Sequence, residues 1–341
     1  MKIKLRPLEE QVIVITGASS GIGLATAQAA AREGAKLVLA ARSEEDLIKI
    51  TDEINRKGGE SIFVVADVGR KEDVEKIADA AKKYFGHYDT WVNNAGVSIY
   101  GRLAEVSDED NRKLFDTNFW GVVYGSLIAA QDLRERGGAI INIGSELSDL
   151  AIQIQGMYSA SKHAVKGFTD ALRIELEEED APIAVTLVKP AGTNTPYTEH
   201  AKNYMDKGAT LPPPVYAPEE VARAILKACE RPFRDIPVGS ASKMMSAMRQ
   251  IAPRLADRIS EEFMGDAQQM DGPSRNGDGL HHAAGGGRVH GNYEGYVMKN
   301  SIYTRAITNP VITGVVALAA AAGLAILLGG NADREEYDSD Y

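Results

Sequence analysis

The sequence predicts a doubly wound parallel α/β fold, with helices on both faces of one sheet and a helical C-terminal extension. Three observations favour this class. Short β-branched runs alternate with longer amphipathic segments between Gln11 and Gly239, a glycine-rich turn joins the first pair, and the composition changes after Gly239. Repeated strand–helix units place parallel strands side by side through right-handed crossovers. The 341 residues suffice for one large α/β domain and an appendage.

The strands are expected at short runs rich in β-branched residues, because strands buried on both faces have this composition. They are Val12–Thr16, Lys36–Ala41, Ser61–Asp67, Thr90–Asn94, Ala139–Ser145 and Ile183–Lys189, with a possible closing strand at Asp235–Val238. Amphipathic periodicity predicts the intervening helices. They are Gly21–Glu33, Glu44–Lys57, Lys71–Phe85, Asp108–Arg136, Met157–Glu178 and Pro218–Arg231.

Charge and cysteine content exclude several classes of function. The formal net charge of −10 argues against nucleic acid as a partner, because phosphate binding needs a basic face. The single cysteine, Cys229, leaves no intramolecular disulfide and no thiolate metal cluster, and we expect no metal site. Residues 1–10 contain no long apolar run and do not resemble a secretory signal. A cytoplasmic catalytic domain is therefore expected.

A glycine-rich turn, Thr16–Gly23, follows the first strand and opens the first helix. Its glycines, Gly17, Gly21 and Gly23, have the spacing G-x-x-x-G-x-G and let the backbone approach a pyrophosphate. The helix N-terminus adds free N–H groups and a positive dipole end. A tight strand-to-helix connection is the alternative, but the place of the turn after the first strand favours a dinucleotide site.

Arg42 lies just after the second strand, where an NAD site usually carries a carboxylate for the ribose 2′-hydroxyl. No carboxylate stands there. The guanidinium of Arg42 could instead pair with a 2′-phosphate, which favours NADP(H) over NAD(H). The alternative is a solvated arginine at a strand end.

Tyr158 and Lys162 are four residues apart in a helical stretch and therefore share a face. A neighbouring ammonium lowers the pKa of a phenol, and a tyrosine tuned in this way can shuttle the proton of a carbonyl reduction. Ser145 ends a predicted strand, at the edge where doubly wound sheets bind ligands, and its hydroxyl could hold the substrate oxygen. Taken alone, a tyrosine–lysine pair at this spacing is more typical of a surface helix with a half-buried tyrosine.

Together these motifs resemble the short-chain dehydrogenase/reductase family over residues 8–240. Besides the cofactor turn, the resemblance includes Asn93–Gly96 after the fourth strand, Asn118 within a helix, and Ser145 placed thirteen residues before Tyr158. It implies a Rossmann-like fold and a catalytic set of Asn118, Ser145, Tyr158 and Lys162. It implies cofactor contacts from Gly17, Ser19, Ser20, Gly21, Ile22, Gly23, Arg42, Asp67, Val68, Asn94, Ala95, Gly96, Tyr158, Lys162, Pro190, Gly192, Thr193 and Thr195.

In this resemblance, Asp67 holds the adenine amino group, Asn118 supports a water in the proton relay, and Lys162 also holds the nicotinamide ribose. The sequence departs from the family pattern at Ala191, where the family commonly has glycine, which leaves the carboxamide contacts of Thr193 and Thr195 less certain. The stretch Tyr197–Tyr216 corresponds to a substrate lid. The resemblance further implies a small-molecule carbonyl or alcohol substrate and a homodimer.

The chain after the catalytic domain, residues 1–239, is expected to have three parts. They are an amphipathic helix at 240–264, a flexible linker at 265–298 that is rich in Gly, Asn, Asp and His, and a terminal segment at 299–341. The terminal segment contains the uncharged run Val311–Gly330, long enough for a membrane-anchoring helix. An anchor would favour a lipophilic substrate, whereas the alternative is an alanine-rich helix docked on protein.

Two other functions remain open from the sequence. The first is a catalytically silent dinucleotide-binding sensor or scaffold on the same fold. The second is a membrane-anchored interaction protein whose function lies in the extension. The complete serine–tyrosine–lysine set favours an oxidoreductase over both.

Overall fold

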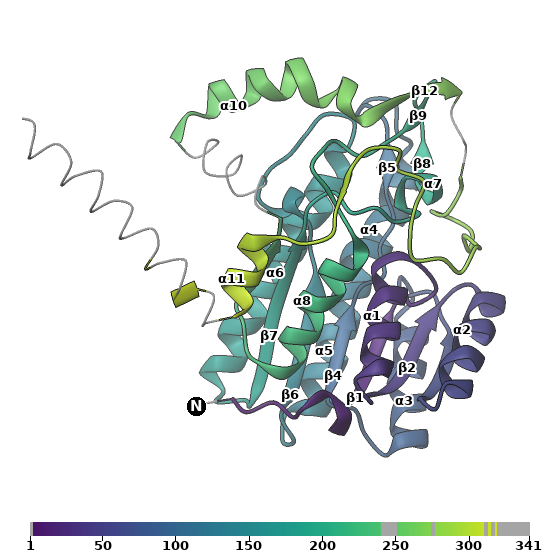
Figure 1. The fold of residues 1–341 in the computed structure, drawn as a ribbon, viewed down its shortest axis with the longest axis vertical. Coiled ribbons are helices and arrows are strands. Elements are labelled where there is room, and N and C mark those ends of the chain that lie inside the picture. The colour runs from purple at the N-terminus through teal and green to yellow at the C-terminus, as the bar shows by residue number, and fades with distance from the viewer. Residues whose placement is uncertain (1–2, 240–250, 274–276, 310–312, 315–317, 319–341) are drawn as a thin grey trace, which may run out of the picture. The chain divides into compact units, whose positions relative to one another are not determined.

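Seven parallel strands form the central sheet of the described residues, in the order β11-β7-β6-β4-β1-β2-β3 (Figure 1). The strands are β1 Val12–Thr16, β2 Lys36–Ala41, β3 Glu60–Val65, β4 Thr90–Asn93, β6 Gly138–Ile143, β7 Ile183–Pro190 and β11 Asp235–Val238. The structure is a computed structural model that describes residues 3–239, 251–273, 277–309, 313–314 and 318. The strand order reverses between β1 and β4, so a crevice opens there at the carboxyl ends of the strands.

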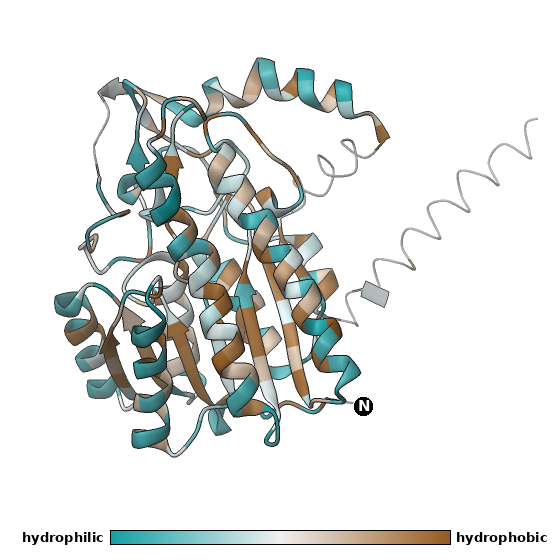
Figure 2. Ribbon diagram, turned by 180° about the vertical axis from the view of Figure 1, so that it is seen from behind, coloured by the Kyte–Doolittle hydropathy of each residue, from teal (hydrophilic) through white to brown (hydrophobic). Residues whose placement is uncertain are grey.

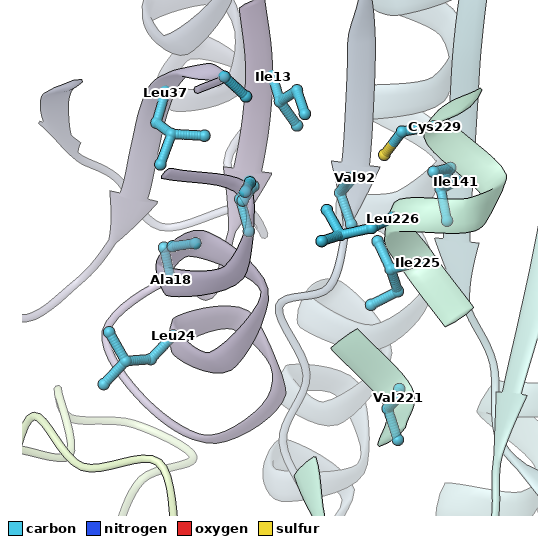
Figure 3. Packing of buried hydrophobic residues seen from close by; sticks show 14 of the residues in the cluster. Ile13, Ala18, Leu24, Leu37, Val92, Ile141, Val221, Ile225, Leu226 and Cys229 are labelled. Carbon is cyan, nitrogen blue, oxygen red and sulfur yellow. The ribbon is translucent and has the colours of Figure 1, made fainter. Parts of the chain in front are cut away.

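Helices cover both faces of the sheet, which confirms the predicted doubly wound architecture. One face carries α1 Gly21–Arg32, α2 Glu44–Arg56 and α8 Pro218–Glu230, and the other carries α3 Lys71–Phe85, α5 Gly121–Leu133 and α6 Gly156–Glu178. Figure 2 shows hydrophobic residues concentrated on the strands between these layers. In Figure 3, Ile225 and Leu226 of α8 lie close to Val92 and Ile141 of the sheet. Cys229 is fully buried in the same cluster.

A π-helical turn interrupts the long helix predicted over Asp108–Arg136. The helix consists of α4 Asp108–Phe115, a π turn at Asp116–Trp120 and α5. Gly121, directly after the wide turn, allows close approach to Val68, because a Cβ there would lie 2.7 Å from the valine side chain. Periodicity alone does not reveal one extra residue in a turn, and such turns are frequent at functional sites.

A buried polar network joins the middle of the sheet to the helices on one face. Asn93 of β4 donates to Asn142 of β6 at 2.8 Å and to Ser126 of α5 at 3.0 Å. Asn142 donates to Thr169 of α6 at 3.0 Å, and Trp91 donates to Asn93 at 2.7 Å. The network fixes α5 and α6 against the strands that end at the crevice.

Three small two-stranded sheets cover the carboxyl edge of the large one. They pair β5 Ile99–Tyr100 with β8 Lys202–Asn203, β9 Lys207–Ala209 with β12 Gln269–Pro273, and β10 Val215–Tyr216 with β13 Val297–Met298. The expected lid, Tyr197–Tyr216, contains α7 Tyr197–His200 and strands β8 to β10. Two of the three pairs therefore bring strands from the extension onto this region.

The stretch 265–298, for which composition favours a flexible linker, follows the surface of the catalytic domain where the structure describes it. Leu280 is fully buried, and Gln268 is buried as well. The strand partners lie about sixty residues away in sequence or further, so local composition could not predict them. Met1–Ser301 accordingly forms one compact unit, and Ile302–Tyr341 forms a second.

The amphipathic helix expected over 240–264 is described from residue 251. It contains α10 Pro253–Ile259 and a π turn at Ser260–Met264, and its apolar residues Leu255 and Phe263 are 53% and 63% exposed. The second unit contains α11 Ile302–Thr308. No helix of the described residues has the length and apolar character needed to cross a bilayer. The run Val311–Gly330 lies outside the described residues except at positions 313, 314 and 318.

Candidate active site

Two adjoining clefts lie at the carboxyl ends of the strands and share Ile22, Asn94, Gly96, Thr195 and Tyr197. The first extends along β1 and β2, and the second lies between β6 and α6. Every predicted cofactor residue except Gly23 lines one or both clefts, as do Ser145, Tyr158 and Lys162. The fold thus gathers residues that are far apart in sequence along one continuous groove.

The phosphate-binding turn has the geometry that its glycines predict. Gly17 and Gly21 adopt positive φ values of 65° and 53°, a region that favours glycine. Gly23 must lack a side chain for the turn to pack closely against α1, because a Cβ there would lie 2.2 Å from the Gly17 carbonyl oxygen. Asn94 donates to the Thr16 carbonyl at 2.9 Å and so ties β4 to the turn. This cradle of glycines before a helix N-terminus fits a dinucleotide pyrophosphate.

Arg42 and Asp67, which follow β2 and β3, both line the first cleft. Asp67 forms an ion pair with Lys113 at 2.7 Å and accepts from the Gly69 amide at 3.0 Å. The Arg42 guanidinium donates to two backbone carbonyls of the extension, those of Gly279 and Leu280. Arg42 is therefore a fixed, half-buried cation rather than a solvated arginine.

Ser145 is held by a short 3₁₀ turn, Glu146–Ser148, which follows β6 directly. Its hydroxyl accepts from the Leu147 amide at 3.1 Å, and its own amide donates to the Ser148 hydroxyl at 3.1 Å. These reciprocal bonds form a capping box, so the position of Ser145 depends on a residue three places later.

Tyr158 and Lys162 lie on successive turns near the start of α6, and both are buried. The Lys162 ammonium donates to the Ile143 carbonyl at 2.9 Å and lies 5.7 Å from the centroid of the Tyr158 ring. Burial lowers the pKa of Lys162 to about 8. The lysine thus stands between the end of β6 and the tyrosine, as a shared helix face requires.

The pKa of Tyr158 differs from the sequence-based expectation. Burial raises it above the usual value, while hydrogen bonds with Tyr197 and Ser145 act in the opposite direction and the charge of Glu146 raises it further. Loss of hydration therefore raises the pKa of Tyr158, in place of the decrease that was expected from Lys162. The ammonium of Lys162 donates instead to a backbone carbonyl. The polar partners that favour the phenolate are the two hydroxyl groups.

Asn118 lies in the π turn and is fully buried next to the groove rather than in its lining. Its side chain accepts from the Val97 amide at 2.8 Å and donates to the Val97 carbonyl at 3.0 Å. It also donates to the Ser161 hydroxyl at 3.2 Å, one residue before Lys162. Asn118 therefore links the strand that ends at Asn93 to the helix of Tyr158.

Three polar side chains that line the second cleft were not among the predicted catalytic and cofactor-binding residues: Glu146, Gln155 and Tyr197. Burial raises the pKa of Glu146 to about 7, although the Gly192 amide donates to its carboxylate and lowers it. The Tyr197 ring lies 5.7 Å from that of Tyr158, and its hydroxyl donates to Gln155 at 3.3 Å. Two signals were visible in the sequence: Glu146 is adjacent to Ser145, and Tyr197 begins the expected lid. The position of Gln155 depends on tertiary packing.

The end of β7 and the loop after it line the second cleft. Pro190, Gly192, Thr193 and Thr195 line it together with Ala191, the residue that departs from the family pattern. The Thr193 hydroxyl donates to the Ala191 carbonyl at 2.8 Å, and Ala191 is buried with a backbone bond to Val238. The alanine is thus accommodated without disrupting the loop.

Comparison with known proteins gives a consistent result. The short chain dehydrogenase family profile matches residues 11–206. An uncharacterized oxidoreductase of Bacillus subtilis, YxnA, is 47% identical over 330 residues, covering 94% of this chain and 93% of the relative. The 11-beta-hydroxysteroid dehydrogenase A of Sesamum indicum is 40% identical, over 55% of this chain and 54% of its own length.

Two solved structures share the fold. A short-chain dehydrogenase/reductase from Burkholderia phymatum in complex with NAD superposes with a TM-score of 0.66 at 29% identity, over 74% of this chain and 96% of its own. An alcohol dehydrogenase from Thermococcus sibiricus complexed with 5-hydroxy-NADP gives a TM-score of 0.60 at 28% identity, over 68% and 97% of the two chains. This chain is thus longer than the domain it shares with both.

Proposed function

Because this chain belongs to the short-chain dehydrogenase family and is an NAD(P)-dependent oxidoreductase acting on CH–OH groups, we propose that it uses NADP(H) and Tyr158 to interconvert a carbonyl and an alcohol. The observation that carries the proposal is the meeting of Ser145, Tyr158 and Lys162 in one cleft. That cleft continues into the groove of the phosphate-binding turn. A catalytically silent sensor would have no need of all three side chains there.

The bound nicotinamide supplies or accepts the hydride. Ser145, fixed by its capping box, holds the substrate oxygen with its hydroxyl. Tyr158 donates a proton to that oxygen during reduction and accepts it during oxidation. Lys162 binds the nicotinamide ribose, and Asn118 supports proton supply through the elements that it joins.

Arg42 supports the preference for NADP(H). Its guanidinium lines the adenosine end of the groove, and no carboxylate takes the place next to it on β2. A fixed guanidinium suits a 2′-phosphate, since charge-assisted hydrogen bonds are strongest where the donor is already oriented.

A lipophilic substrate fits the second cleft. Its outer lining includes Leu147, Ile152, Leu211 and Pro212. Burial of apolar surface favours a ligand of the same character, with orientation supplied by a few polar groups. The hydroxysteroid dehydrogenase names of several plant relatives point in the same direction.

A homodimer fits the exposed apolar residues of α5 and α6 and the turn before α5. Trp120, Leu127 and Ile174 are 44%, 51% and 58% exposed. Trp120 stacks on Tyr124 at 5.9 Å between ring centroids, which gives a rigid aromatic surface of the kind enriched in interfaces.

A substrate screen with NADPH and NADH in parallel tests the proposed function. We expect the purified chain to oxidise NADPH in the presence of a lipophilic ketone or aldehyde, and to do so faster than NADH. Replacement Arg42→Ala should reduce the preference for NADPH by about tenfold or more, the effect of one lost charged hydrogen bond. A preference for NADH would overturn the assignment of Arg42, and no binding of either cofactor would overturn the function.

A further inference from the structure

The segment Gly277–Gly291, here called the strap, crosses the mouth of the cofactor groove. In Figure 1 it belongs to the yellow-green chain after β12, which runs beside α7 and the start of α1. The Gly279 amide donates to the His200 carbonyl at 2.9 Å. The Gly21 amide, at the N-terminus of α1, donates to the Arg288 carbonyl at 3.0 Å. The strap therefore passes from the lid to the phosphate-binding turn.

Side chains at both ends of the strap attach it to the catalytic domain. His281 contacts the carboxylate of Asp110, on α4, at 2.6 Å. Arg288 forms an ion pair with Glu199 of α7. Leu280 is fully buried in the apolar cluster that contains Tyr158. The strap is therefore held to the catalytic domain at His281 and at Arg288, and the buried Leu280 lies next to the first of these attachments.

The middle of the strap carries almost no side chains. Positions 283 to 287 read Ala-Ala-Gly-Gly-Gly. Gly279, Ala283 and Ala284 line the same cleft as the phosphate-binding turn, Arg42 and Asp67. Small residues at these positions leave the groove open beneath the strap, whereas larger side chains would enter it. The strap thus roofs the adenosine half of the groove without filling it.

The strap also orients the residue on which cofactor preference depends. Arg42 donates to the Leu280 carbonyl at 3.0 Å and to the Gly279 carbonyl. Two carbonyl acceptors fix the plane of a guanidinium and leave its other donors available to a ligand.

We propose that the strap is the outer wall of the cofactor site, closing over the adenosine and phosphates of the dinucleotide and opening for cofactor exchange. This inference rests on the proposed function, because it requires a dinucleotide in the groove. It assigns a binding role to part of the extension beyond the family domain. Retention of the cofactor then depends on the His281 and Arg288 attachments.

The variant H281A/R288A of the full chain tests this role, with H282A as its matched control. His282 is the neighbouring histidine, 80% exposed at its side chain. NADPH dissociation is measured by stopped-flow fluorescence of the reduced nicotinamide. We expect the double variant to release NADPH about tenfold faster or more, as the loss of two charged contacts implies, and H282A to match the wild type. An unchanged release rate in a folded double variant would overturn the inference.

Trypsin cleavage of the wild type gives a second test that needs no variant. Arg288 is the only lysine or arginine in the strap, so cleavage there reports on the strap alone. We expect NADPH to slow this cleavage, because the closed strap is held on the cofactor. Unchanged or faster cleavage with NADPH bound would contradict the proposed wall. Absence of NADPH binding to the wild type would instead refute the proposed cofactor, and the two failures are therefore distinguishable.

Discussion

Glu146 is the residue whose environment is least expected beside a catalytic serine. Burial raises the pKa of its carboxyl from 4.5 to about 7. Between these values the folded protein keeps the proton that the unfolded chain releases. Each rise in pH across this range therefore lowers the free energy of unfolding, and the contribution of Glu146 to stability is lost by about pH 7.

Replacement of Glu146 by glutamine should remove this pH dependence. We predict that E146Q gains stability relative to the wild type as the pH rises from 5 to 7.5, because a neutral amide has no proton to lose. Thermal unfolding of both proteins across that range measures the difference. A constant difference between wild type and variant at all pH values would show that Glu146 titrates normally.

At the residue scale, sequence motifs predicted the positions that line the groove but not their electrostatics. Spacing alone brings Tyr158 and Lys162 to one helix face, since i and i+4 always meet there. The pKa of Tyr158, by contrast, depends on burial and on Tyr197, which begins α7 and is distant in sequence. Such contacts have no local signature.

At the scale of elements, the polar network of Asn93 holds β4 and β6 against α5 and α6. We predict that Asn93→Ala lowers the free energy of unfolding by about 2–4 kcal/mol, because Trp91, Ser126 and Asn142 each lose a buried partner. Urea unfolding measures the loss. Thr169→Val, which removes one partner of Asn142, should cost only about 1 kcal/mol. Equal losses in the two variants would contradict a cooperative network.

The elements of the large sheet were predictable because their signals are local. β1, β2 and β11 have the predicted bounds, and β3, β4, β6 and β7 differ from theirs by one or two residues at one or both ends. The short strands β5, β8, β9, β10, β12 and β13 were not predicted, because strands of two to five residues take their stability from distant partners. The π turn at Asn118 was likewise invisible to periodicity.

At the scale of the molecule, the boundary of the functional unit lies well beyond the family domain. Strands β12 and β13 pair with the catalytic domain, and the Ser301 amide donates to Glu220 at 3.0 Å. We predict that a chain ending after Ser301 keeps the melting temperature of the full chain, because Met1–Ser301 forms one compact unit. A chain ending after Gly239 should melt at least about 5 °C lower, since it loses buried Leu280 and Gln268.

Calorimetry of the two truncated chains decides this point. Equal melting temperatures would mean that the extension adds nothing to the fold. The last strand of the large sheet was predicted correctly, but residues 265–298 were expected to be a flexible linker, because glycine-rich composition describes the segment and not the surface on which it lies.

The most direct test of the central claim is carbonyl-dependent oxidation of NADPH by Y158F at saturating cofactor. The substitution removes only the hydroxyl that transfers the proton and keeps the ring that packs against Tyr197. We expect kcat to fall by about 10²- to 10⁴-fold while NADPH still binds with wild-type affinity. Turnover equal to that of the wild type would show that Tyr158 does not transfer the proton and would overturn its assignment as the acid and base of the reaction.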